Sequence, residues 1–221
     1  MKQIILSTAS LAQSWLADDL LPLLHRESRV LVLTCIREEF HVIGESLEAS
    51  TQKEIARSLF YYGVPKNQMC FCRLFEQNIS KIRHALENCD VVIFVGNDAL
   101  LAHHRLLDFD LMADIQRYKG TEILIGPMAY LFIGNSQFYP LKSDIQNISG
   151  LDVLFHYVES EESLRAILNV LEDQAYAVIA LKESAGFIYE EGELIPLGDA
   201  YLFQPSQIDE LYEAYLTYQE N

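Results

Sequence analysis

The sequence has no long apolar run and little positive charge. None of its 221 residues belongs to an apolar stretch near the ~20 residues that a membrane-spanning helix needs. The first six residues hold one lysine and a three-residue apolar run, too short for the core of a signal peptide. Lys and Arg number 16 against 32 Asp and Glu, which gives a net charge of −16, and the basic residues are scattered. We therefore expect neither a membrane nor a nucleic-acid partner, because this charge repels phosphate backbones.

Cysteine is also scarce: the chain has four, Cys35, Cys70, Cys72 and Cys89. Without a secretion signal, they are expected to be reduced thiols in a cytoplasmic protein. The Cys70-x-Cys72 string could supply half of a zinc site, but four ligands are needed and no second pair has suitable spacing. We expect no metal and no cofactor.

Short apolar runs alternate with amphipathic stretches in the first 125 residues. Strands are expected at 4–6, 29–34, 69–74, 89–96 and 122–125, and helices at 46–62, 79–86 and 99–118. The runs at 29–34 and 91–95 are almost uniformly apolar, which is typical of strands covered on both faces. The alternation predicts a three-layer α/β/α fold with a mainly parallel sheet, in one domain spanning residues 1–221.

The pattern changes after residue 135. A helix is expected at 161–171, a strand at 177–181, a hairpin over 187–197 with its turn at 191–193, and another strand at 200–203. A terminal amphipathic helix at 208–218 carries Tyr212, Tyr215 and Tyr218. Their three-residue spacing predicts a packing surface, and a homodimer contact is one candidate for it.

The turn after the strand at 122–125 lies where ligands bind in parallel sheets, beyond the carboxyl ends of the strands. It reads Gly126-Pro127-Met128-Ala129-Tyr130. A serine at position 128 would complete the strand-turn-helix elbow of a G-x-S-x-G hydrolase. The thioether of Met128 cannot be deprotonated and cannot attack a carbonyl. The sequence therefore raises the question of whether this chain is an enzyme.

Four strings, in order, resemble the S51 serine peptidases (dipeptidase E, cyanophycinase and their relatives), which have a class I glutamine amidotransferase-like fold. Residues 93–98 are similar to the end of a strand that enters a G-G-G-N-T loop, and residues 126–131 to a G-x-S-A-G-A elbow. Residues 154–157, Leu-Phe-His-Tyr, are similar to a P-H-Y string without its proline. Residues 178–186 are similar to an apolar strand and an acidic segment. The resemblance covers roughly residues 3–203.

The resemblance implies roles for single residues. His156 falls on the general base, and Glu183 on the acid that orients it in some members; Asp144 is the candidate where an aspartate after the elbow does so. Met128 falls on the nucleophile. Ligand contacts are implied for Ala129 and Asp144, and for a shortened oxyanion loop at Gly96 and Asn97. Tyr130 replaces the second glycine of the elbow.

Two functions follow from this pattern. The first is an inactive S51-like protein that binds a small acidic peptide or amino acid, or acts as a regulatory protein. The second is a hydrolase that uses another nucleophile, such as Cys35, or a water activated by His156. Simpler interpretations stay open: His156 can be a structural histidine, and Glu183 a solvated acid at a strand end.

Overall fold

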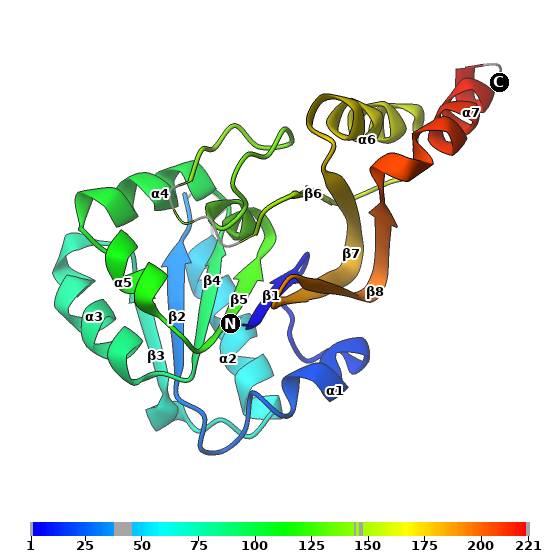
Figure 1. The fold of residues 1–221 in the computed structure, drawn as a ribbon. Coiled ribbons are helices and arrows are strands. Elements are labelled where there is room, and N and C mark those ends of the chain that lie inside the picture. The colour runs from blue at the N-terminus through cyan, green and yellow to red at the C-terminus, as the bar shows by residue number, and fades with distance from the viewer. Residues whose placement is uncertain (1, 38–45, 144, 146–147, 220–221) are drawn as a thin grey trace.

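The computed structural model describes residues 2–37, 46–143, 145 and 148–219, with the backbone alone for 218 and 219 (Figure 1). The described residues form one eight-stranded sheet in the order β3-β2-β4-β5-β1-β7-β6, with β8 paired to β7. The strands are β1 (Lys2–Leu6), β2 (Val30–Cys35), β3 (Met69–Arg73), β4 (Val91–Gly96), β5 (Thr121–Ile125), β6 (Leu151–Phe155), β7 (Ala177–Glu190) and β8 (Glu193–Phe203).

Five strands, β1 to β5, run parallel, and β7 reverses the direction. The strand β7 pairs antiparallel with β1 through residues 186–190 and parallel with β6 through residues 177–181. Leu6 at the end of β1 pairs with Gly186, and Phe155 at the end of β6 pairs with Leu181. The carboxyl ends of β1 and β6 therefore meet from opposite directions at residues 182–185 of β7.

Helices cover both faces of the parallel strands because side chains alternate across each strand. In β2, Leu31 and Leu33 belong to the core under α3, α4 and α5, whereas Val30 and Val32 belong to the core under α1 and α2. The helices are α1 (Ala17–Leu20), α2 (Leu47–Tyr61), α3 (Ile79–Asn88), α4 (Ala99–Asp108), α5 (Met112–Arg117), α6 (Glu161–Gln174) and α7 (Ile208–Gln219).

A third, smaller core lies between α6, α7 and the first half of β7. The helix α7 packs along α6 and extends away from the rest of the molecule, at the red end of the ribbon (Figure 1). None of the described helices is both long and apolar enough to cross a membrane.

The structure confirms the predicted α/β fold and differs from the sequence prediction in several places; one is that the strands expected at 194–197 and 200–203 are a single strand, β8. The helix expected over 99–118 is two helices, interrupted where Asp110 adopts a left-handed φ of 54°. The strands expected at 177–181 and 187–189 are one continuous β7 with an irregularity between Leu181 and Ala185. The sequence pattern did not indicate β6. The hairpin turn is as expected: Glu191 and Gly192 both have positive φ, which suits a two-residue turn between twisted strands.

Candidate functional site

Met128 lies in the core. It belongs to η4 (Gly126–Leu131), a 3₁₀ helix that follows β5 directly, and its side chain is 1% exposed. No helix continues from η4 in the described part of residues 132–150. Gly126 takes the left-handed φ of 58° that opens the turn, and Ala129 is completely buried. The residue that the resemblance aligns with the nucleophile is therefore an apolar side chain that solvent does not reach.

Gly96 ends β4 directly against the end of β2. A Cβ at this position would collide with the backbone oxygen of Cys35 and would come within 3.1 Å of the Met128 Cε. Glycine is thus required by the close approach of the two strands, and the methyl group of Met128 lies beside it.

Asn97 has both ends of its side-chain amide bound to the backbone of Arg37. Its Oδ1 accepts from the Arg37 N–H at 2.8 Å, and its Nδ2 donates to the Arg37 oxygen at 3.0 Å. The next residue, Asp98, caps α4 and forms an ion pair with the Arg37 guanidinium at 3.0 Å. The short loop after β4 therefore binds the segment that follows β2 through the side chains of Asn97 and Asp98.

Tyr130 fills the space next to the elbow. It is 5% exposed, and its hydroxyl donates a 2.7 Å hydrogen bond to the backbone oxygen of Val153 on β6. Its ring stacks on Tyr139, with centroids 4.7 Å apart, and meets Phe155 edge-on at 5.7 Å. Burial raises the pKa of the Tyr130 hydroxyl, which stays protonated and keeps donating. The residue that the resemblance aligns with the second glycine of an elbow is thus an aromatic side chain, held in place by a hydrogen bond and by ring stacking.

The segment that carries Tyr139 is fixed to β6 by a buried carboxylate. Asp152 has no exposed surface, and it accepts from the backbone N–H of Gln137 at 2.7 Å and from that of Val153 at 2.8 Å. The Tyr139 hydroxyl in turn accepts from the N–H of Leu100, in the first turn of α4. Tyr139 thus connects the elbow to the start of α4.

His156 is the first residue after β6. Its side chain is exposed, and its backbone has a left-handed φ of 57° that ends the strand. Tyr157 resumes contact with β7 by donating its N–H to the Leu181 oxygen at 2.9 Å. The neighbouring residue, Phe155, contacts Tyr130, whereas the side chain of His156 is exposed.

Glu183 lies in the irregular part of β7, with an exposed side chain. Among the described residues, no hydrogen bond or ion pair joins its carboxylate to His156. The Ser7 hydroxyl, just beyond β1, donates to the backbone oxygen of Glu183 at 2.7 Å, and the Ser7 N–H donates to Ala185. Ser7 therefore fastens the irregular segment, a contact that sequence analysis missed because the two residues are 176 positions apart. Asp144 lies outside the described residues.

Cys35 is the other nucleophile that sequence analysis considered. Its side chain is 1% exposed, and burial raises the pKa of the thiol to about 11. A thiol with this pKa is almost wholly protonated at neutral pH, and the thiolate is the nucleophile. The position at the end of β2 is as expected, but the environment suits an inert core cysteine.

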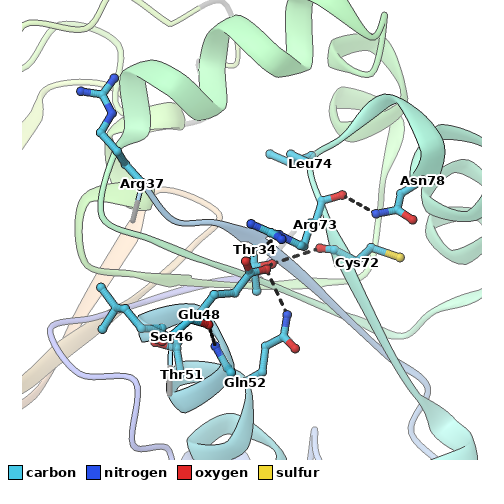
Figure 2. Close-up of polar contacts among 12 residues, drawn as sticks. Thr34, Arg37, Ser46, Glu48, Thr51, Gln52, Cys72, Arg73, Leu74 and Asn78 are labelled. Atoms are coloured by element: carbon cyan, nitrogen blue, oxygen red, sulfur yellow. Dashed lines mark hydrogen bonds and ion pairs between the residues drawn. The ribbon is translucent and has the colours of Figure 1, made fainter. Parts of the chain in front are cut away.

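A polar cluster around the buried Glu48 carboxylate lies at the carboxyl ends of β2 and β3 (Figure 2). Glu48, in the first turn of α2, is 5% exposed and accepts from the Thr34 hydroxyl at 2.7 Å and the Gln52 amide at 3.2 Å. The Arg73 guanidinium forms an ion pair with the same carboxylate. A carboxylate of the chain itself thus occupies the helix N-terminus, where an anionic ligand could otherwise bind.

Metal ligands are not gathered in the part of the chain that the structure describes. No group of three His, Cys, Asp or Glu side chains is placed to hold an ion there. The Cys70 and Cys72 sulfurs are 3.7 Å apart, on one face of β3.

Comparison with solved structures identifies the fold of this chain. The sequence matches no protein-family model and no curated protein. Among solved structures, a peptidase from an acI-B1 actinobacterium matches with a TM-score of 0.64 and 11% identity, over 92% of this chain and 91% of that one. A candidate peptidase E protein from Listeria monocytogenes EGD-e matches with a TM-score of 0.57 and 12% identity, over 88% and 96%. The fold is that of a peptidase E-like protein.

The peptidase E-like fold places the predicted residues in two groups. Gly96, Met128 and Ala129 are together at the ends of β4 and β5, packed within the core. His156 is exposed directly after β6, and Glu183 is exposed in the middle of β7. Tyr130 lies between the groups. The resemblance could suggest the first group and the replacement of a glycine by Tyr130, but not the hydrogen bond by which this side chain reaches β6.

Proposed function

We propose that this protein is a non-catalytic member of the peptidase E-like structural group, which binds a ligand without cleaving it. The observation that carries the proposal is Met128, buried at the nucleophile position with its methyl group against Gly96. Acyl transfer needs a nucleophile beside a base, and an oxyanion site nearby. Here the residue that the resemblance aligns with the nucleophile is a buried thioether.

The geometry around His156 supports the same proposal. The resemblance makes this residue a general base, but its side chain is exposed and no described acid orients it. Orientation by a third group is what makes such a histidine effective in a triad. The bound Tyr130 hydroxyl and its stacked ring occupy the space between the elbow and β6.

The ligand that we propose is a small acidic peptide or an amino acid, bound at the carboxyl edge of the sheet. Arg37 supports this assignment, because its guanidinium lies at that edge and its side chain is 64% exposed (Figure 2). One ion-pair contact with Asp98 leaves further N–H donors of the guanidinium for a carboxylate.

Two measurements test this proposal. Incubation with a fluorophosphonate probe should leave the intact mass of the protein unchanged, because no described nucleophile is activated. Calorimetric titration with an Asp-containing dipeptide should give saturable binding that Arg37→Gln weakens and Arg57→Gln does not. Arg57 is a matched control, since it is an exposed arginine on α2 that forms an i,i+3 ion pair with Glu54. Covalent labelling that His156→Ala abolishes would overturn the proposal.

A further inference from the structure

A cleft of about 330 Å³ lies at the amino ends of β2 and β3, at the opposite edge of the sheet from η4. Three segments line it: residues 29–31, residues 67–70, and α3 with its C-cap. The α3 residues are Lys81, His84, Ala85 and Asn88. Their spacing of i, i+3, i+4 and i+7 shows that one face of the helix forms a wall of the cleft.

The charged side chains of this cleft are basic. None of the described residues that line it is Asp or Glu, although acids outnumber Lys and Arg by 32 to 16 in the chain. Arg29 is matched by Asp90, which accepts from its backbone N–H at 2.8 Å and its guanidinium at 3.4 Å. Lys81 donates a hydrogen bond to the Phe71 oxygen at 3.2 Å and also interacts with the Cys72 thiol, and an ammonium group has three donors. The cleft therefore offers cationic donors to an anion.

The inner surface of the cleft is apolar. Cys70 and Ala85, which are half-buried and pack against the core under α3, form its floor. Cys89 also lines the cleft, and burial raises the pKa of its thiol to about 11, so it adds no negative charge at neutral pH. A ligand with an apolar body could desolvate this floor while its anionic group stays on the helix face.

We propose that this cleft binds a small phosphate monoester with a flat organic body, of the size of a nucleoside monophosphate. The phosphate contacts Lys81 and His84, and the body packs over Cys70 and Ala85. The side-chain amides of Asn67 and Gln68, on the same wall as Met69, face hydrogen-bonding groups on the body. A volume of about 330 Å³ is at the lower end for small-molecule sites, which favours one nucleotide over a dinucleotide.

Calorimetric titration with adenosine 5′-monophosphate tests this site directly, with adenosine and inorganic phosphate as separate arms. The monophosphate should bind more tightly than either fragment. Lys81→Gln should weaken it by at least about tenfold, the value of one charge-assisted hydrogen bond. Lys119→Gln is the matched control: this exposed lysine lies outside the cleft and its loss should leave binding unchanged. The bound nucleotide should also slow the alkylation of Cys70 by iodoacetamide, which peptide mass spectrometry measures.

Three results would each overturn the assignment. The first is no binding of the monophosphate to the wild-type protein at millimolar concentration. The second is equal binding to wild type and Lys81→Gln, or no protection of Cys70. The third is inorganic phosphate binding as tightly as the monophosphate, which would leave an anion site without the organic body. His84→Gln provides a second variant, read by the same titration, if Lys81→Gln does not fold.

Discussion

The hydroxyl of Tyr130 donates a hydrogen bond to the backbone oxygen of Val153, 23 residues away, across the space between the elbow and β6. This one contact connects η4 to a strand on the far side of β1 and β7. It also holds an aromatic ring where the resemblance to S51 peptidases implies a glycine. A buried aromatic side chain thus fastens η4 to β6.

Removing this hydroxyl should cost stability. In Tyr130→Phe the buried Val153 oxygen loses its side-chain donor, and we expect about 1–2 kcal/mol of destabilisation. Urea unfolding followed by circular dichroism measures it. Tyr61→Phe is the control, because Tyr61 is 66% exposed and its variant should unfold at the wild-type midpoint. Equal midpoints for both variants would show that the Tyr130 bond contributes nothing.

Cys35 should be unreactive in the folded protein. It is 1% exposed and its thiol has a pKa of about 11, so little thiolate is available. Iodoacetamide at pH 8 should modify the half-buried Cys70 well before Cys35, and the difference should vanish in denaturant. Peptide mass spectrometry measures both sites in one sample. Rapid modification of Cys35 in the native protein would revive it as a candidate nucleophile.

Glu122 should make stability depend on pH. This carboxyl is completely buried on β5, and burial raises its pKa from 4.5 to about 7, although the Gln3 amide donates to it at 2.7 Å. The folded state therefore binds a proton more tightly than the unfolded state. Its stabilising contribution is complete below pH 4.5 and is lost as the pH rises to 7. A shift of this size corresponds to on the order of 3 kcal/mol.

The variant Glu122→Gln separates this contribution from others. It should be more stable than wild type at pH 8 and should lack the wild-type loss of stability between pH 4.5 and 7. Glu193→Gln, which removes an exposed acid at the start of β8, should keep the wild-type pH profile. Thermal unfolding across that pH range compares the three proteins. A Glu122→Gln profile parallel to wild type would show that Glu122 does not titrate there.

Serine at the elbow should not create a hydrolase. In Met128→Ser the new hydroxyl would still be buried beside Gly96, and Asn97 and Tyr130 would keep their backbone bonds. We expect no dipeptide hydrolysis from this variant. The double variant Met128→Ser/Tyr130→Gly also removes the aromatic ring. Hydrolysis by this variant would show that the ring alone blocks the site. Activity in Met128→Ser alone would show that the rest of the machinery is intact.

Much of the fold follows from local patterns. The strands β2 and β4 are uniformly apolar because both of their faces are covered, and this signal is visible in the sequence. The bounds of α2 are also local: Ser46 accepts from the Ala49 N–H as its N-cap, and Gly63 stops the helix with a φ of 85°.

The rest depends on contacts between distant residues. The strand β6 is short and its partner, β7, follows it by more than 20 residues, so no local signal distinguishes it from a loop. A buried acid such as Glu122 is tolerated because Gln3 lies opposite it, 119 residues away. In the site, the nucleophile position could be predicted from spacing. The burial of Met128 and the exposure of His156 could not, because both depend on how β6 and Tyr130 pack.

We propose above that the elbow does not support acyl transfer. Loss of the nucleophile alone costs on the order of 10⁶ in turnover in a measured triad. The most direct measurement is the release of free amino acid from a panel of Asp-containing dipeptides by purified wild type, His156→Ala and Met128→Ser. We predict no release above the uncatalysed rate for any of the three proteins. Release by the wild type that His156→Ala abolishes would contradict this account.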